Sequence, residues 1–311
     1  MFELVKALCD LPGPSGYEDQ VQGYVAEVLR GAGCDVAATP IGNVLAHVGG
    51  RGKKAVLVAH ADEIAVIVRS ITDDGFLRLT GGGGLVTSGS PPSPLLAGEH
   101  CLVMTERGAV PGVVGARTGH PGAAVIWNPP ATRRLGANIV GKAMDDRAAL
   151  AIALEVARRV DRPRLAYDLW IASTIQEEGA LAGADALGRD YDLAISLDVG
   201  PAGDVPGITP DEVPCVLGGG PALVHKDSGV RYHKGLTYAI ARAAEAEEIP
   251  IQHVTFQSYA SDSAALLKNG IPAALVCYPT RYTHSPIETV REEDLDAAVR
   301  LLVAFFQRGG F

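Results

Sequence analysis

Aromatic residues and basic clusters are both scarce in this sequence. Phe, Trp and Tyr make up only 5% of its 311 residues, whereas proteins that bind single-stranded nucleic acid usually stack the bases on such rings. The formal net charge is −9, and no run of Lys or Arg interrupts the acidic balance. Phosphate backbones would be repelled by this charge. We therefore expect no nucleic-acid partner.

Cysteine is also rare, and long apolar runs are missing. The five cysteines are odd in number and widely spaced, without a CxxC pair, so neither a disulfide framework nor a zinc ribbon is predicted. Glu3 and Lys6 interrupt the apolar stretch at the N-terminus, which is therefore unlike a secretory signal. No apolar run reaches the roughly 20 residues that cross a bilayer. These absences predict a cytoplasmic protein without a membrane partner.

The sequence does contain alternating helical and strand patterns. Ser15-Gly16-Tyr17-Glu18 is a capping box, after which apolar residues repeat at helical spacing. The wholly apolar segment Ala55-Val56-Leu57-Val58-Ala59 is typical of a strand covered on both faces. After residue 139 strands alternate with helices, and a second capping box, Thr289-Val290-Arg291-Glu292, is predicted to open the last helix. The predicted fold is α/β, with a mostly parallel or mixed sheet sandwiched by helices.

A segment of different composition and periodicity divides this α/β pattern into two parts. Between residues 72 and 138, clusters of glycine, proline and serine separate short strand-like pieces, and no helical periodicity is present. This pattern predicts a small inserted β domain at 72–138. Residues 1–71 and 139–311 then form one discontinuous α/β domain.

His60 and Asp62 are the first candidates for chemistry. His60 follows the apolar strand and Asp62 stands two residues on, so both side chains share one face of an extended chain. Asp62 can then accept the second ring N–H of His60 and leave the other nitrogen for a metal ion. Taken alone, such a pair is more often a hydrogen-bonded histidine beside a solvated aspartate.

Two acidic pairs add further candidates. Asp145-Asp146 opens a predicted helix, where acidic residues usually serve as caps. Glu177-Glu178 follows the predicted strand 167–174. Because neighbouring side chains of an extended chain point in opposite directions, one of these carboxylates can bind metal while the other faces a substrate. Two exposed carboxylates in a loop are the simpler interpretation of that pair.

The positions of these residues change the interpretation. His60, Asp198 and Glu178 fall at or just after the carboxyl ends of predicted strands, where open α/β sheets place their ligand sites. Together with Asp145 and His284 they offer imidazole and carboxylate ligands but no thiolate, a set that suits zinc, cobalt or manganese. Two such ions about 3.5–4 Å apart are a recurrent hydrolytic device. The sequence therefore predicts a hydrolase with two divalent metal ions per subunit.

At these residues the chain resembles the tetrahedral aminopeptidase family of two-metal exopeptidases, also known as glutamyl or deblocking aminopeptidases. The likeness covers nearly the whole chain. It rests on five motifs in the family's order, which are Ala59-His60-Ala61-Asp62-Glu63-Ile64, Gly141-Lys142-Ala143-Met144-Asp145-Asp146-Arg147, Gln176-Glu177-Glu178-Gly179, Leu197-Asp198-Val199 and Arg281-Tyr282-Thr283-His284-Ser285-Pro286.

The resemblance implies a ligand set. Asp145 should bridge the two ions, which would be zinc or cobalt, with manganese as a third candidate. His60 and Asp198 should complete one metal site. Glu178 and His284 should complete the other.

The resemblance also implies an activity, the removal of N-terminal residues from peptide substrates. Glu177 should be the general base, taking a proton from a metal-activated water and passing it to the leaving amine. Asp62 should support His60, as the spacing already suggested, and is the second residue expected to serve catalysis.

The sequence departs from the family pattern in two places. The insert is shorter than the family's, so a homo-oligomer is expected but its size is not, and the insert should serve oligomerisation or substrate access. Where the family usually has a Gly-Gly-Thr-Asp-Ala-like segment, this chain reads Tyr259-Ala260-Ser261-Asp262-Ser263. We interpret Asp262 as a cap of the short helix that follows it.

Two other functions remain open at this point. A deacylase or carboxypeptidase acting on N-acylated amino acids would use the same ligand logic, but only an aminopeptidase requires a free amino terminus. A non-catalytic assembly protein could also keep this fold. All five expected ligands and the expected base are nevertheless present in the sequence.

Overall fold

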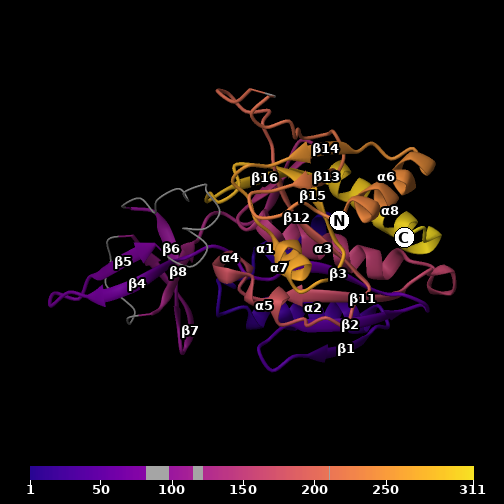
Figure 1. Ribbon diagram of the computed structural model, residues 1–311. Helices are drawn as coiled ribbons and strands as arrows, with labels where there is room; N and C mark the ends of the chain where they lie inside the picture. Colours follow the sequence, from indigo (N-terminus) through magenta and orange to yellow (C-terminus); the bar gives the residue numbers. More distant parts are fainter. Residues whose placement is uncertain (82–97, 115–121, 210) are drawn as a thin grey trace.

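Figure 1 shows the computed structural model, which describes residues 1–81, 98–114, 122–209 and 211–311. A larger sheet is flanked by helices, and a smaller sheet lies to one side of it. The helices are α1 (Phe2–Cys9), α2 (Asp19–Gly31), α3 (Met144–Arg159), α4 (Glu177–Ala180), α5 (Ala182–Asp185), α6 (Lys234–Ala246), α7 (Asp262–Lys268) and α8 (Glu292–Arg308), with a 3-10 turn η1 (Arg162–Arg164). The strands of the larger sheet are β1 (Asp35–Ala38), β2 (Val44–Gly49), β3 (Lys54–His60), β9 (Arg133–Leu135), β10 (Asn138–Gly141), β11 (Asp168–Thr174), β12 (Leu193–Pro201), β13 (Ala222–Lys226), β14 (Gln252–Thr255), β15 (Ala273–Arg281) and β16 (Glu288–Arg291).

The centre of the larger sheet is parallel. β11 pairs with β3, β3 with β12, and β12 with β15, all in parallel. Antiparallel pairs extend the sheet on both sides, through β2 and through β13 and β16. The prediction of an α/β fold with a mixed sheet between helices is therefore confirmed. Parallel strands end at the same edge, and Thr174 of β11 lies directly opposite His60 of β3.

Each face of the larger sheet has its own core. Leu57 of β3 belongs to the core that α1, α2, α3, α6 and α8 cover, whereas Val56 and Val58 belong to the core that includes side chains of α5 and α7. Burying one such side chain contributes about 1.5–3 kcal/mol, and here both faces of the strand are buried. This explains why the segment is apolar without alternation. Among the described residues, none of the helices has the length and apolar character that a bilayer-spanning segment requires.

The smaller sheet is antiparallel throughout and has two small cores of its own. Its strands are β4 (Val66–Ile71), β5 (Leu77–Gly81), β6 (His100–Thr105), β7 (Gly108–Val113) and β8 (Ala124–Trp127), in the order β5-β4-β8-β6-β7. It begins before residue 72, and β9 of the larger sheet falls inside 72–138. The predicted insert also includes residues 82–97 and 115–121, which lie outside the described residues. Its role as a separate domain stays a prediction.

Both predicted capping boxes are wrong. The Ser15 hydroxyl donates to Asp62 at 2.6 Å, and α2 begins only at Asp19. Thr289 lies in β16, opposite Val140 of β10, and α8 begins three residues later without a side-chain cap. In both places a partner far away in the sequence replaces the local one.

Candidate active site

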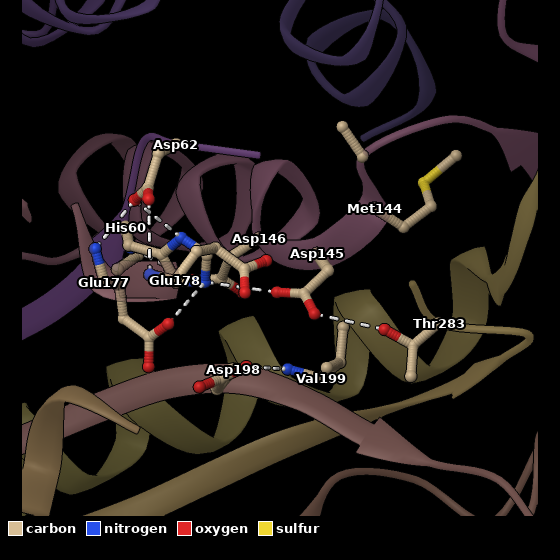
Figure 2. Close-up of polar contacts among 12 residues, drawn as sticks. His60, Asp62, Met144, Asp145, Asp146, Glu177, Glu178, Asp198, Val199 and Thr283 are labelled. Carbon is tan, nitrogen blue, oxygen red and sulfur yellow. Dashed lines mark hydrogen bonds and ion pairs between the residues drawn. The ribbon is translucent and has the colours of Figure 1, made fainter. Parts of the chain in front are cut away.

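His60 is the last residue of β3 and is only 2% exposed. Its Nε2 lies 3.1 Å from Asp145 Oδ1, and its Nδ1 lies 3.2 Å from Asp62 Oδ1 without the alignment of a good hydrogen bond. Burial lowers the pKa of the imidazole, but the surrounding carboxylates, Asp146 first, raise this pKa well above its usual value. Figure 2 shows Asp62 on one side of the ring and Asp145 on the other.

Asp62 anchors the turn that carries the two glutamates. Its carboxylate is fully buried and accepts the backbone N–H groups of Glu177 at 3.0 Å and Glu178 at 3.2 Å. The third donor is the Ser15 hydroxyl. Burial raises the pKa of Asp62, but the adjacent His60 ring and the hydrogen bonds from Ser15 and Glu177 outweigh burial and lower it below its usual value.

The backbone of the glutamate pair differs from the prediction. Glu177 and Glu178 are not extended but form the first residues of α4, after Gln176 at a φ of 52°. Successive helical side chains point about 100° apart, so the two carboxylates still diverge. Glu178 Oε2 lies 3.4 Å from His284 Nε2, while Glu177 Oε2 lies 3.9 Å from His60 Nε2.

Asp145 stands between the two histidines. One carboxylate oxygen lies 3.1 Å from His60 Nε2 and the other lies 3.2 Å from His284 Nε2. The Thr283 hydroxyl donates to the second oxygen at 3.1 Å, as Figure 2 shows. Burial raises the pKa of Asp145, but hydrogen bonds from His284 and His60 reverse this effect and lower it. The carboxylate is therefore ionised, with one oxygen toward each histidine.

His284 lies in the loop after β15, in a left-handed conformation with a φ of 59°. Its backbone N–H donates to Glu288 at 2.8 Å, and Glu288 also accepts the N–H of Asp145 at 3.0 Å. Burial lowers the pKa of the His284 ring, but Glu178 and Asp145 raise it to about 12. Glu288, which the sequence did not single out, thus holds two residues of the site in place.

Asp198 completes the set of expected residues. It lies inside β12 rather than at its end, is 4% exposed and accepts the backbone N–H of Val199 at 2.7 Å. Burial, and then the charge of Asp145, raise its pKa well above the usual value. Burial likewise raises the pKa of Glu177 well above the usual value. Such carboxylates need a cation nearby to be ionised at neutral pH.

The donor atoms fit divalent metal ions. Single donor atoms of His60, Asp145, Asp146 and Asp198 lie within 4.8 Å of one another, as do those of Asp145, Glu178 and His284. Asp145 belongs to both groups, and neither group includes a cysteine. Glu178 Oε1 is buried without a hydrogen-bond partner. Oxygen and imidazole donors of this kind suit zinc and other borderline divalent ions.

Asp146 enters the first group although the sequence analysis treated it as a cap. Both of its oxygens have protein partners, since one accepts the backbone N–H of His60 at 3.1 Å and the other accepts the Tyr278 hydroxyl at 2.7 Å. Asp146 therefore fixes the backbone that carries His60. Tyr278 is distant in sequence and comes from a buried strand, so no local signal marked it.

Asp262 is not the helix cap that was expected. Ser261 is the N-cap residue of α7, without a side-chain cap, and one Asp262 oxygen accepts the Thr174 hydroxyl instead. The other oxygen is buried without a partner. Burial raises the pKa of Asp262 to about 6.

A buried charged cluster holds the N-terminal segment under the site. Glu63 follows Asp62 in the sequence, and Lys142 Nζ donates to both of its carboxylate oxygens at 2.6 Å. The fully buried Arg147 guanidinium donates to the carbonyl oxygens of Leu8 at 2.9 Å and Gly13 at 3.0 Å. A Cβ on Gly13 would lie 2.8 Å from that guanidinium, so only glycine permits the contact. The cluster fixes the segment that delivers Ser15 to Asp62.

A cavity with about 420 Å³ of empty space, including its open mouth, lies beside the carboxylates. Its lining includes Asp145, Glu177, Glu178, Asp198 and His284, so five of the seven expected residues face one space. The charged cluster is therefore open to solvent through this cavity.

Comparison with known proteins identifies the family. Residues 42–124 and 119–301 match the family described as M42 glutamyl aminopeptidase. The chain belongs to this family. A relative from Acetivibrio thermocellus that carries an aminopeptidase name is 30% identical, over 97% of this chain and 97% of its own length. The M42 chain is thus a peptide-bond hydrolase of the aminopeptidase class, and the buried cluster agrees with divalent metal binding.

Solved structures extend this comparison. The aminopeptidase APDkam598 from Desulfurococcus kamchatkensis is 29% identical, with a TM-score of 0.90 over 99% of this chain and 95% of its own. A structure described as PhTET1-12s, a dodecamer in the asymmetric unit, is 26% identical, with a TM-score of 0.86 over 98% of both chains. The resemblance stated from the five motifs is therefore confirmed at the level of the family and the fold.

Proposed function

We propose that this M42 aminopeptidase uses two divalent ions and that Asp145 would offer a ligand to each. The observation that carries the proposal is the position of Asp145, whose two oxygens face two different histidines at 3.1 and 3.2 Å. His60 and Asp198 would hold one ion. Glu178 and His284 would hold the other. The donor set suits zinc or cobalt, with manganese as a third candidate.

When bound, the two ions supply Lewis-acid activation of water and of the peptide carbonyl. The protein contributes the placement of its own groups. Asp62 lies against Nδ1 of His60 and fixes the backbone of Glu177 and Glu178 by accepting two hydrogen bonds. A buried, rigid support of this kind keeps the reacting geometry without reorganisation.

Glu177 is the proposed general base. Its carboxylate lines the cavity, and its N–H is held by Asp62. The carboxylate would accept a proton from the attacking water and return it to the amine that leaves. Burial raises the pKa of Glu177, which suits a group that must both take and give a proton near neutral pH.

The deciding test replaces Glu177 by Gln. We expect the variant to keep its metal content, measured by mass spectrometry, and to lose turnover of leucine amide by about 10²-fold or more. Glu27→Gln, an exposed position on α2, is the matched control and should be unchanged in both measurements. Peptide hydrolysis at the wild-type rate by Glu177→Gln would remove Glu177 from the mechanism.

A blocked substrate separates the remaining alternatives. The aminopeptidase should cleave leucine amide and leave N-acetyl-leucine amide intact. A deacylase or carboxypeptidase that acts on N-acylated amino acids would instead cleave N-acetyl-leucine, which is blocked at the amine and keeps a free carboxylate. A non-catalytic assembly protein would cleave none of them.

We also propose that the chain forms a homo-oligomer. The support is the dodecameric relative, which shares the fold over 98% of both chains. The smaller sheet, at one side of the molecule in Figure 1, is the segment we propose for subunit contacts or for limiting substrate access. Light scattering of the purified protein measures the assembly directly.

A further inference from the structure

The cavity beside the site is lined by two kinds of residues. The first kind is polar or charged and comprises Asp145, Glu177, Glu178, Asp198, Thr283 and His284. The second kind, called here the neutral wall, comprises Val199, Pro201, Ser258, Tyr259 and Ala260. Within the part of the chain that the structure describes, no Lys or Arg lines this cavity. The neutral wall therefore offers apolar surface and hydroxyl groups, but no cation.

The nearest basic residue in the sequence of the lining loop is already paired. Arg281 stands two residues before Thr283, which lines the cavity. Its Nε donates to Asp204 at 3.1 Å, and its Nη2 donates to the other oxygen of the same carboxylate. A fork-to-fork pair of this kind is among the strongest charged contacts in proteins. The Arg281 charge is therefore compensated within the chain.

Tyr259 makes the neutral wall rigid. Its hydroxyl donates to the Val199 carbonyl at 2.8 Å, and its ring packs on Phe256 with 5.2 Å between ring centres. The other residues of this wall, Val199, Pro201, Ser258 and Ala260, carry no ionisable side chain. A charged side chain placed against it would lose water without gaining a partner, which is unfavourable.

We propose that this enzyme selects peptides whose N-terminal side chain is uncharged and apolar, and that Val199, Pro201, Tyr259 and Ala260 form the pocket that selects it. This inference rests on the proposed function, because the side chain reaches this wall only when the substrate amine faces the carboxylate cluster. An acidic side chain finds no free cation there. A basic one finds only the carboxylates that would bind the metal ions and Glu177, the proposed general base.

The first test is a panel of amino-acid amides on the metal-loaded enzyme. We expect kcat/KM for leucine amide to exceed that for glutamic acid α-amide and lysine amide by about tenfold or more. Faster cleavage of either charged amide would overturn the selectivity and leave the aminopeptidase proposal intact. Failure to cleave any amide would overturn both. Calorimetric binding of the same amides to Glu177→Gln should give the same order without turnover.

The second test adds a cation to the neutral wall. Ala260→Lys should raise the ratio of kcat/KM for the glutamic acid amide over the leucine amide by about tenfold. Gln257→Lys adds the same charge at an exposed position outside the cavity lining and should leave the ratio unchanged. Equal ratios in both variants would overturn the pocket assignment. If Ala260→Lys does not fold, the amide panel on the unmodified enzyme decides the proposal.

Discussion

The carboxylate of Asp62 shows how one residue supports a site without facing the substrate. It contacts His60 and accepts three further hydrogen bonds from Ser15, Glu177 and Glu178. Each donor group loses its hydrogen bonds to water on folding, so each needs the Asp62 carboxylate as an acceptor. Asp62 thereby ties the end of β3 to the start of α4. Asp62 thus supports the backbone of Glu177, the proposed general base.

Removal of the Ser15 hydroxyl tests this support. We expect Ser15→Ala to lower the free energy of unfolding by about 1–3 kcal/mol, because the buried Asp62 loses a donor. We expect kcat to fall severalfold while KM stays near the wild-type value. Urea unfolding and steady-state kinetics measure the two effects. Ser70→Ala in β4, outside this network, should change neither.

The unusual pKa of Asp262 predicts a pH dependence of stability. Its value of about 6 in the folded protein lies above the ordinary 3.8, so the folded state keeps a proton that the unfolded chain has lost. The stability from this group is complete below about pH 4 and is lost as the pH rises through about 6. Asp262→Asn should therefore gain about 1–3 kcal/mol over wild type at about pH 7.5.

Urea unfolding of the metal-stripped proteins at about pH 5 and about pH 7.5 checks this prediction, since the gain should shrink at the lower pH. Asp73→Asn, at an exposed position, is the control and should show no such difference. A gain that is equal at both values would contradict the assignment to Asp262.

At the scale of elements, helix α3 organises the N-terminal segment. Arg147 is fully buried and donates to backbone carbonyls of the segment that follows α1. Its neighbours on α3 pack on β3 and β12 at the same time. The helix therefore connects the segment that carries Ser15 to the strands that carry His60 and Asp198.

Arg147→Lys tests this connection, because lysine keeps the charge but not the planar fork. We expect a loss of about 2–4 kcal/mol in the free energy of unfolding, together with faster proteolysis of the segment before α2. Arg158→Lys on the exposed side of the same helix is the matched control, since its ion pair with Glu155 lies at the surface. Its effect should stay below about 1 kcal/mol.

Some of the elements and site residues could be predicted from the sequence, and others could not. The buried strands were readable because both faces of β3 are apolar, and His60 was placed correctly at the end of that strand, whereas Asp198 lies inside β12. The capping boxes failed because Ser15 and Thr289 have partners that lie far away in the sequence. Glu288 and Tyr278 were missed for the same reason, since their roles depend on contacts with Asp145 and Asp146. Local patterns carry no information about such pairs.

At the scale of the whole molecule, the buried carboxylates of the site should make stability depend on bound metal. Burial raises the pKa values of Glu177, Glu178 and Asp198, and among the described residues the charges of His60 and His284 oppose this rise. Ligands that bind only the folded state stabilise it. The metal-loaded protein should therefore be considerably more stable than the stripped one.

Calorimetry with and without a chelator measures this difference. We expect stripping to lower the melting temperature by about 5–10 °C, and added zinc to restore it. Asp145→Asn weakens the ligand that both proposed ions share. The melting temperature of this variant should therefore change much less when the metal is stripped. An unchanged melting temperature of the wild type after complete removal of metal would contradict the two-ion proposal.

The smaller sheet departs from the larger one and returns to it through neighbouring strands. Val66 of β4 lies opposite Val125 of β8 in an antiparallel pair, so the excursion closes on itself between Ala65 and Asn128. We therefore predict that the sheet can be exchanged for one of another length or shape, by recombination or design, without shifting the register of β3 or β9. Such an exchange would alter what surrounds the active site while the buried carboxylates keep their places.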